Sequence, residues 1–523
     1  MGLVPRMGRM GRMGRLAGLV AGLTSGLLAA GASFAATAAA PPADAATALQ
    51  RCRLDGLARA ARCGTLQRPL DAARPEGPHI GLHFAVLPAQ ARHAAADPVL
   101  FFAGGPGQSA IDLAGLLAAR HARLNLQRDL VFIDQRGTGR SAPLVCEDDR
   151  PRAALLPLAS RVSPAQRLAR LAACRQTLQA LPYGDLRFFS TEIASADVEA
   201  VRQHLGAAQV NAIGASYGTR AALDYLRQFP GRVRRLVLDG VVPPDMRLAT
   251  AVARDNQAAL DALFSACRAD VGCAGRHPDL TAQWQRLLAS MPAQVQLPHP
   301  VSGQLETMTL DADGLRALVR GPLYSPALAA GLPAALVEAA AGRFAPLAAL
   351  ASALGGASHA VLASGMHYAV VCAEDLGDSA PPVDPADRAA LDDPVNSFGH
   401  SFRRGYLQAC ADWPRARISA GFYSVRASLV PVWLLSGGLD PVTPPRHGQR
   451  VAQALGAAAA HWVVPQGGHG VLGLPCLREA MHRFIEAEDA QALAAAPPSA
   501  DCLSALPRPP AFVPPGRPHK GPP

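Results

Sequence analysis

The sequence predicts an α/β protein with a doubly wound, mostly parallel sheet and an inserted, mostly helical cap domain. Two continuous apolar runs, at residues 98–102 and 130–133, each end in a glycine-rich turn. Unalternated apolar strands are typical of a parallel sheet buried on both faces. Between residues 195 and 238, helix and strand patterns alternate. This alternation predicts a ligand crevice at the carboxyl ends of the strands.

The individual elements follow from apolar periodicity and from the turn residues between them. An early strand is expected at 79–87, before the two apolar runs. A helix is expected over 195–206, because Val198, Val201 and Leu205 recur at i, i+3 and i+7 and Gly206 provides a C-cap. The remaining expected elements are a strand at 210–213, a helix over 217–229, strands at 233–238, 430–435 and 461–464, and a last helix at 476–488.

Composition divides the chain into five segments. A basic start, an apolar run from 16 to 28 and a small-residue exit predict a secretory signal peptide. The alternative is a membrane anchor, but the run is interrupted by glycines and is short for a span of about 20 residues, so no stable anchor is expected. The segments are a signal peptide at 1–35, the first part of the core at 36–241, a helical cap at 242–428, the second part of the core at 429–506, and a Pro-rich tail at 507–523 that we expect to be disordered.

The formal net charge of +10 alone would suit an acidic partner. Four of the arginines lie in the first fifteen residues, and the others are scattered without interleaved aromatic residues. A nucleic-acid partner is therefore not expected. No sequence pattern calls for a cofactor, and none is expected.

Ten cysteines, an even number, fit an exported protein in an oxidising compartment. We predict local pairing, with buried free thiols as the alternative for one or two pairs. The predicted pairs are Cys52 with Cys63, Cys146 with Cys174, Cys267 with Cys273, Cys372 with Cys410, and Cys476 with Cys502. No metal site is expected, because there is no Cys-x-x-Cys, and a strand would hold the rings of His79 and His83 about 13 Å apart.

The run G-A-S-Y-G at 214–218 predicts a nucleophile elbow around Ser216. A tight turn from strand to helix leaves no room for a Cβ two residues either side of the serine, which explains both glycines. The hydroxyl becomes a nucleophile only if an imidazole takes its proton and a carboxylate orients that imidazole. The sequence therefore has to supply both partners.

Asp440 and His469 are the candidate partners, because each follows an expected strand on a glycine-containing turn. For Asp440 the alternative role is a helix N-cap, and Asp239 is the alternative acid. The tetrahedral intermediate also needs two N–H donors, for which we assign Tyr217 and Gly105.

The segment D-Q-R-G-T-G-R-S at 134–141 contains an acidic and a basic residue two positions apart. We expect Asp134 and Arg136 to form a buried ion pair behind the glycine loop that contains Gly105.

Six motifs together resemble the exported tripeptidyl aminopeptidases and their proline iminopeptidase relatives. They are A-G-G-P-G at 103–107, D-Q-R-G-T-G-R-S at 134–141, G-A-S-Y-G-T at 214–219, L-D-G-V at 238–241, D-P-V-T-P at 440–444 and G-H-G at 468–470. The resemblance spans residues 52–502, and Cys476 and Cys502 match the tripeptidyl branch. It implies an α/β-hydrolase fold and release of short peptides from a free amino terminus through an acyl-enzyme. Ala103 departs from the histidine usual in proline iminopeptidases, so the resemblance does not imply imino-terminal specificity.

The resemblance also implies a carboxylate in the cap that recognises the substrate amine. Glu374 and Asp375 are the candidates, and a solvated acidic pair beside a disulfide is the alternative. The predicted function is an exported serine aminopeptidase, periplasmic or secreted, acting on peptides. A carboxylesterase or amidase acting on small esters or amides is the competing function, since one triad serves both. A silent binding protein is disfavoured, because Ser216, Asp440 and His469 occur in the expected order.

Overall fold

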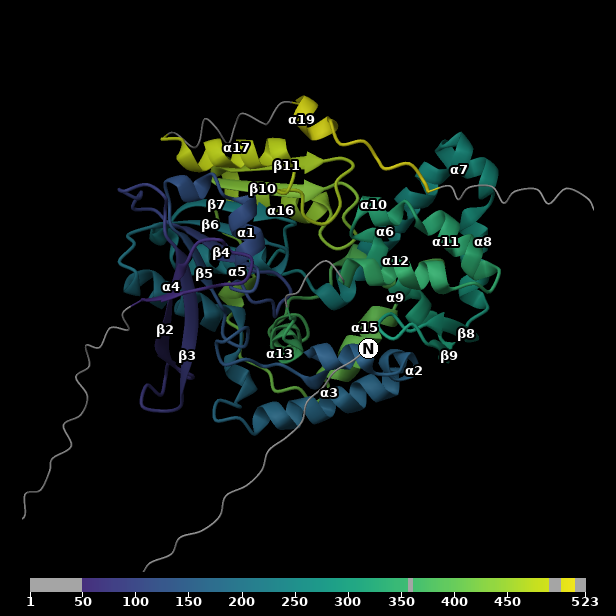
Figure 1. Ribbon diagram of the computed structural model, residues 1–523, viewed down its shortest axis with the longest axis horizontal. Helices are drawn as coiled ribbons and strands as arrows, with labels where there is room; N and C mark the ends of the chain where they lie inside the picture. The colour runs from purple at the N-terminus through teal and green to yellow at the C-terminus, as the bar shows by residue number, and fades with distance from the viewer. Residues whose placement is uncertain (1–48, 356–360, 489–499, 513–523) are drawn as a thin grey trace, which may run out of the picture. The chain divides into compact units, whose positions relative to one another are not determined.

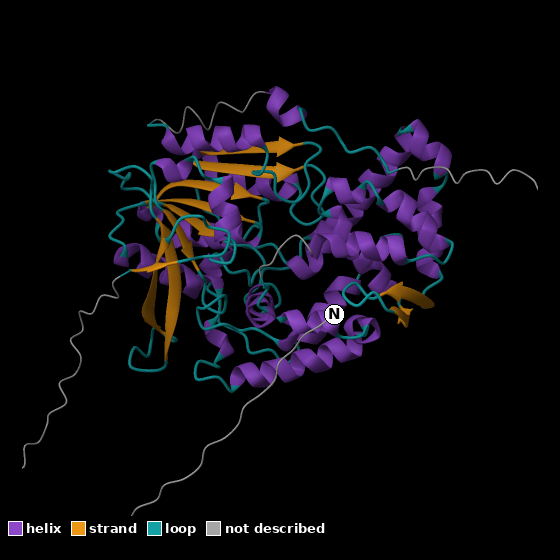
Figure 2. Cartoon of the chain, viewed as in Figure 1, coloured by secondary structure: helices purple, strands orange, loops and turns teal. Residues whose placement is uncertain are grey.

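The computed structural model describes residues 49–355, 361–488 and 500–512. The predicted signal peptide at 1–35 lies outside this range. Within it, a nine-stranded sheet lies beside a group of helices (Figures 1 and 2). The strands are β1 (Gln50–Cys52), β2 (Ala61–Pro69), β3 (His79–Leu87), β4 (Val99–Phe102), β5 (Leu130–Ile133), β6 (Val210–Ala215), β7 (Val233–Asp239), β10 (Val432–Gly437) and β11 (Ala459–Val464).

The spatial order of the sheet is β1-β2-β3-β5-β4-β6-β7-β10-β11. Every pairing from β5 to β11 is parallel, and the pairings that involve β1, β2 and β3 are antiparallel. The predicted α/β class with a mostly parallel sheet is confirmed. β1 and β2 were not expected, and in β2 only Ala61 and Gly64 are buried, so it lacks a continuous apolar run.

Helices cover both faces of the sheet, so every strand of the nine-stranded sheet except β1 contributes side chains to two hydrophobic cores. In β4, Leu100 packs into one core while Val99 and Phe101 pack into the other. The first core includes α4 (Thr191–His204), α5 (Tyr217–Gln228) and α16 (Pro445–Leu455). The second includes α1 (Ala114–Arg120) and α17 (Pro475–Glu486). This two-sided burial explains why the strands are continuously apolar.

The chain between β7 and β10 is mostly helical, as predicted, and has a hydrophobic core of its own. Its helices are α6 (Leu248–Ala269), α7 (Val271–Arg276), α8 (Leu280–Ala289), α9 (Ala312–Leu323), α10 (Pro326–Ala329), α11 (Leu332–Ala340), α12 (Ala345–Gly355), α13 (Ser364–Glu374), α14 (Pro385–Asp392) and α15 (Ser401–Cys410). An antiparallel hairpin, β8 (Ala293–Pro298) with β9 (Leu305–Leu310), was not expected.

Two helices from the first half of the chain also join this helical region. They are α2 (Leu158–Val162) and α3 (Pro164–Gln179), which lie beside α15 and the hairpin in Figure 1. Leu158 and Val162 pack against the helical core, and the N–H of Leu158 donates to Glu306 of β9. The helical region is therefore built from more of the chain than the segment between β7 and β10.

The start of the Pro-rich tail is ordered against the helices, so the expectation of disorder is wrong for residues 507–512. The N–H of Phe512 donates to the carbonyl of Ala330 at 2.8 Å. Upstream, Cys502 lies on the short helix α19 (Ala500–Ser504) and is joined to Cys476 of α17. A proline-rich chain loses little conformational entropy on docking, which favours its binding along an apolar surface.

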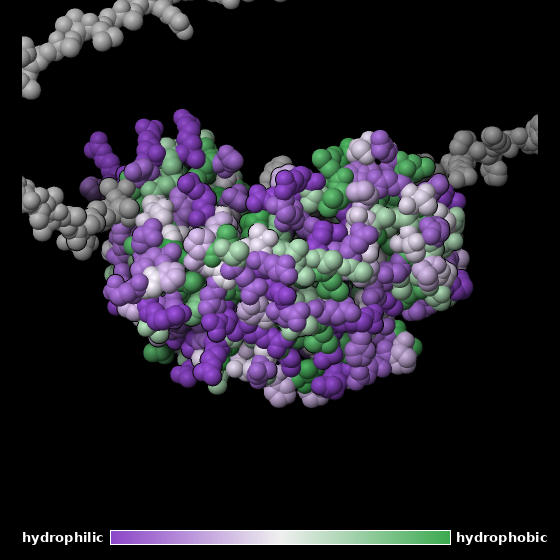
Figure 3. Space-filling view, turned by 90° about the horizontal axis from the view of Figure 1, so that it is seen from below, coloured by the Kyte–Doolittle hydropathy of each residue, from purple (hydrophilic) through white to green (hydrophobic). Residues whose placement is uncertain are grey.

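The structure contains all five predicted disulfides, with no free cysteine. They are Cys52–Cys63, Cys146–Cys174, Cys267–Cys273, Cys372–Cys410 and Cys476–Cys502. Five disulfides indicate an extracytoplasmic protein, because the cytosol keeps thiols reduced. Within the described part of the chain, no helix is long and apolar enough to cross a membrane. The face in Figure 3 mixes hydrophilic and hydrophobic side chains.

The Cys476–Cys502 bridge should contribute more stability than the Cys267–Cys273 bridge, because it closes a longer loop. The sequence separations are 26 and 6 residues. The chain-entropy model gives about 3.5 kcal/mol for the first and about 2.4 kcal/mol for the second. Urea unfolding of the two double Cys→Ala variants should show the larger loss for Cys476 and Cys502. The reverse order would show that strain or local packing, rather than loop closure, sets their contributions.

Candidate active site

Ser216 lies at the turn between β6 and α5, with φ +54° and ψ −128°. This is a sparsely populated conformation for a residue with a side chain, and such strain is typical of a nucleophile elbow. A Cβ on Gly214 would lie 2.5 Å from the carbonyl oxygen of Gly218, and one on Gly218 would overlap the carbonyl oxygen of Phe102. Both glycines are therefore required, because the tight turn leaves no room for a Cβ at either position.

The carboxylate of Asp440 contacts His469 on the loop after β11. Oδ2 of Asp440 lies 2.8 Å from Nδ1 of His469 and accepts a hydrogen bond from the Thr443 hydroxyl at 2.6 Å. Oδ1 accepts from the N–H groups of Val442 and Thr443, both at 2.9 Å. The carboxylate is thus held on both oxygens, and its contact fixes the orientation of the imidazole.

The two groups shift each other's pKa in the directions that catalysis needs. Burial alone would raise the pKa of Asp440, but the charge of His469 and the hydrogen bonds from His469 and Thr443 hold it below its usual value. Burial alone would lower the pKa of His469, but Asp440 outweighs it and the pKa is raised. Asp440 therefore stays ionised, and the imidazole of His469 becomes more basic. A more basic imidazole is better able to accept the proton of the serine hydroxyl.

Asp239, the alternative acid, holds the loop that carries His469. Its carboxylate oxygens accept from the N–H groups of Val471 and Leu472, each at 2.9 Å. Its carbonyl oxygen accepts from the N–H of Ser216 at 2.9 Å. The next residue is Gly240, where a Cβ would lie 3.4 Å from Cε1 of His469. The end of β7 therefore brings the serine turn and the histidine loop to the same edge of the sheet.

The glycine loop after β4 runs along the elbow. A Cβ on Gly104 would lie 3.5 Å from the Cβ of Ser216. Gly105 has φ +110°, a conformation that side chains rarely adopt. Among the described residues, the N–H groups of Gly105 and Tyr217 have no hydrogen-bond partner. Two free donors beside the nucleophile agree with the predicted oxyanion hole, which stays a prediction.

Parts of the helical region lie against the loop that carries Gly105 and the loop that carries His469. The N–H of Ala363 donates to the carbonyl of Gly107, and a Cβ on Gly105 would lie 3.0 Å from the side chain of Leu362. The carbonyl of Tyr324 accepts from the N–H of His469 at 2.9 Å, and the two rings pack edge to face. The helical region thus covers part of the loops that carry Gly105 and His469.

The expected ion pair between Asp134 and Arg136 does not form. Asp134 instead accepts hydrogen bonds from the Ser109 hydroxyl and from the N–H groups of Ile111 and Arg140. Arg136 makes a bidentate pair with Asp197 of α4, at 2.6 and 2.9 Å. The two residues lie near each other in sequence, but their side chains find partners on different elements. Both are buried, so the prediction of core support agrees with the structure, although the predicted pairing is wrong.

Glu374 and Asp375 lie at the end of α13, where both contact Arg220 of α5. The guanidinium is 2.7 Å from Asp375 and 3.4 Å from Glu374. All three residues are at most 2% exposed. Glu374 also accepts from the N–H of Thr191, and Asp375 from that of Leu248. Neither carboxylate is open to a substrate amine, so amine binding there would require one of them to leave Arg220.

Stability should fall with pH because of Glu374. Burial raises its pKa to about 7, outweighing the opposite effects of Arg220 and Thr191. The single positive charge of Arg220 lies between two carboxyl groups and is closer to Asp375 than to Glu374. Glu374 is therefore the less strongly stabilised of the two when ionised. A raised folded-state pKa gives stability that is complete below about pH 4.5 and is lost as the pH rises through 7.

Glu374→Gln keeps an acceptor for Thr191 but removes the titration. Relative to this variant, the wild type should lose about 3 kcal/mol between pH 4.5 and pH 8. Urea unfolding at several pH values would measure the difference. Parallel pH profiles for the two proteins would show that Glu374 does not titrate in this range.

Comparison with known proteins agrees with this geometry. The family model for the alpha/beta hydrolase fold matches residues 97–319, and the model for TAP-like protein matches residues 393–493. The protein is an α/β hydrolase. Its carboxy-terminal part, residues 393–493, is TAP-like, and the chain is similar to serine hydrolases.

Three relatives show the range of activities among proteins similar to this chain. A tripeptidyl aminopeptidase of Streptomyces lividans is 27% identical over 497 residues, which cover 86% of each chain. Serine protease Hip1 of Mycobacterium tuberculosis is 28% identical, covering 76% of this chain and 79% of its own. Carboxylesterase B of the same organism is 29% identical, covering 82% and 85%. Peptidases and an esterase are thus both similar to this chain.

Proposed function

We propose that the protein is an exported aminopeptidase, periplasmic or secreted, that releases short peptides from free amino termini through an acyl-enzyme on Ser216. The observation that carries the proposal is the contact between buried Asp440 and partly exposed His469 beside a strained serine turn, with the helical region packed against the neighbouring loops. Helical segments packed beside the proposed nucleophile favour the end of a chain over the middle of a folded protein. A relative named as a tripeptidyl aminopeptidase, similar over 86% of both chains, also supports it.

The residues suggest how the reaction proceeds. The Ser216 hydroxyl attacks the carbonyl carbon of the scissile bond while His469 takes its proton. The N–H groups of Gly105 and Tyr217 receive the negative charge that develops on the carbonyl oxygen. His469 then protonates the leaving amine as the C–N bond breaks. Water, activated by the same imidazole, releases the amino-terminal peptide from Ser216 as a carboxylic acid.

A carboxylesterase or amidase is the second candidate, supported by the similarity to Carboxylesterase B. The same residues would cleave an ester by the same steps, so the triad does not separate the two functions. The difference lies in whether a free substrate amine contributes to recognition.

The wild type should cleave a tripeptidyl chromogenic amide with a free amine about ten to a hundred times better, in kcat/KM, than the acetylated form. A charge-assisted hydrogen bond in a closed site gives a ratio of this size. Short acyl esters provide the comparison for esterase activity. Equal rates on free and acetylated amides, with faster cleavage of esters, would favour the esterase.

The same ratio, measured in Glu374→Gln and Asp375→Asn, tests the candidate amine carboxylates. Because Arg220 holds both, we expect each variant to keep the preference for the free amine. A ratio that falls to one in a single variant would assign the substrate amine to that carboxylate.

A further inference from the structure

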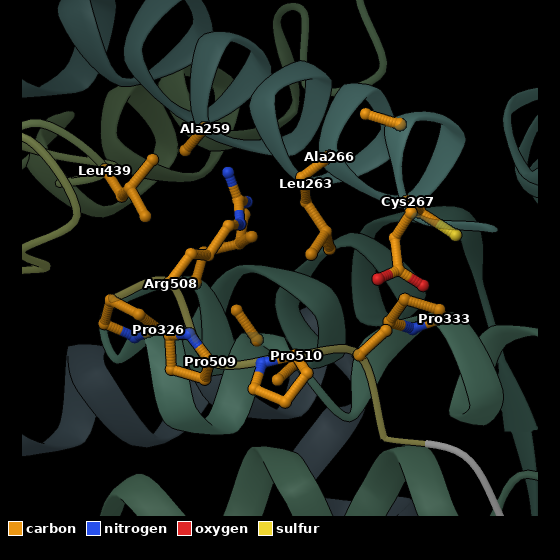
Figure 4. Close-up of a pocket in the computed structure, with 16 residues that line it drawn as sticks. Ala259, Leu263, Ala266, Cys267, Pro326, Pro333, Leu439, Arg508, Pro509 and Pro510 are labelled. Atoms are coloured by element: carbon orange, nitrogen blue, oxygen red, sulfur yellow. The ribbon is translucent and has the colours of Figure 1, made fainter. Parts of the chain in front are cut away.

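A cavity of about 390 Å³ lies between the Pro-rich tail and the helical region, outside the catalytic crevice (Figure 4). Its walls come from α6, α10, α11, the turn before Asp440, and residues 508–511 of the tail. Leu263, Leu323, Pro326, Pro333 and Leu439 make most of the lining apolar. The volume falls in the range of small-molecule sites, which is about 300–1,000 Å³.

One arginine extends into this cavity without an ion pair among the described residues. The lining also includes Asp270, whose Oδ1 accepts a hydrogen bond from the N–H of Cys273 at 2.7 Å and which forms no ion pair with Arg508. Figure 4 shows the side chain of Arg508 extending from the tail toward Ala259 and Leu263 of α6. Among the described residues, no ion pair or hydrogen bond involves its guanidinium. Burial among apolar groups lowers the pKa of Arg508. A half-buried guanidinium without an ion pair keeps part of its hydration and has N–H groups free to bind an anion.

The tail is held at both ends of the cavity, so Arg508 has a defined place. Upstream, the Cys476–Cys502 bridge joins the chain to α17. Downstream, the N–H of Phe512 donates to the carbonyl of Ala330, which is itself a lining residue. Because the tail is already held in place, a ligand would not have to order it, and binding would cost less conformational entropy.

We propose that this cavity binds a monocarboxylate carried on an apolar chain. The planar guanidinium of Arg508 would hold the carboxylate through two parallel hydrogen bonds, and the leucine and proline side chains would cover the chain. Two kinds of ligand carry a carboxylate on an apolar chain: a medium-chain fatty acid, and a short apolar peptide with a free carboxyl end. A serine hydrolase also releases a carboxylic acid at each turnover, so its own product belongs to the same class.

The cavity shares walls with the catalytic loops. Leu439 directly precedes Asp440, and its N–H donates to the carbonyl of Gly467 on the histidine loop. A Cβ on Gly468 would lie 2.5 Å from Pro326, another lining residue. A bound carboxylate would therefore contact residues that support His469 and Asp440 without entering the crevice.

The test is calorimetric titration of decanoate into full-length protein whose Ser216 has been blocked with a small fluorophosphonate, so that the crevice cannot turn over ligand. The wild type should bind decanoate with a stoichiometry of one. Arg508→Met should weaken binding by about tenfold to a hundredfold, because the charge-assisted contact is lost. 1-Decanol, with the same chain and no charge, should bind equally to both proteins. Ala266→Phe, which fills the cavity without changing charge, should also reduce decanoate binding.

Arg426→Met is the matched control, since Arg426 is exposed and does not line the cavity. It should bind decanoate as the wild type does. Competition by a free-acid tripeptide, but not by its amide, would identify a peptide end as the source, and no competition would identify a fatty acid. Wild-type affinity in both Arg508→Met and Ala266→Phe, or no binding to the wild type, would overturn the proposal. Neither result bears on the peptide assays, so the two proposals fail independently.

Discussion

Replacing Ser216 or His469 by alanine should reduce kcat by about 10⁶-fold while leaving the fold intact. In the proposed mechanism Ser216 supplies the nucleophile and His469 moves its proton, so losing either would leave only substrate binding and the oxyanion donors. Asp440→Asn should cost less, because the amide keeps the contact to the histidine loop but not the charge. The measurements are kcat on a tripeptidyl amide and a thermal unfolding curve for each variant.

A fluorophosphonate probe provides the control for this prediction. It should label Ser216 in the wild type and leave Ser216→Ala unlabelled. Labelling at another serine, or wild-type activity in His469→Ala, would contradict the assignment.

The second large effect should come from Arg220→Met. This change leaves Glu374 and Asp375 buried beside an apolar side chain, and removing one partner of a buried ion pair costs about 3 to 5 kcal/mol. Arg123→Met is the matched control, because Arg123 pairs with Glu479 at the surface and should change stability by no more than about 1 kcal/mol. Urea unfolding at pH 7 compares the two. Equal losses would show that the Arg220 cluster contributes no more than a surface pair.

A combined variant tests whether the loss comes from the unpaired carboxylates. Adding Asp375→Asn and Glu374→Gln to Arg220→Met removes the buried charges and should recover part of the stability. If the triple variant is as unstable as the sum of its single changes, the destabilisation arises from packing instead.

The elements of the fold that the sequence predicted correctly, and the candidate site residues that it brought forward, depend on local patterns. Ser216 was identifiable because the elbow imposes its glycines at fixed spacing, and Asp440 and His469 because each lies on a turn after an apolar strand. Gly206 was identifiable as a helix C-cap, and its φ of +69° is the left-handed conformation expected there.

Interactions between distant segments were not predictable in this way. Arg136 pairs with Asp197 rather than Asp134, and Arg220 is the partner of Glu374 and Asp375, because tertiary contact decides which charges meet. The hairpin in the helical region was also missed, since its exposed face has the polarity of a loop. No local pattern marks residues 507–512 as docked, because proline-rich sequence is equally typical of free chain.

Each of the five disulfides joins a cysteine to the next cysteine in the chain. A polypeptide delivered amino terminus first into an oxidising compartment presents its thiols in that order. If each thiol reacts with the next one to emerge, the native connectivity forms directly, without an exchange step between mispaired bridges. The order of the cysteines along the chain thus suits the protein to oxidation while it is being translocated.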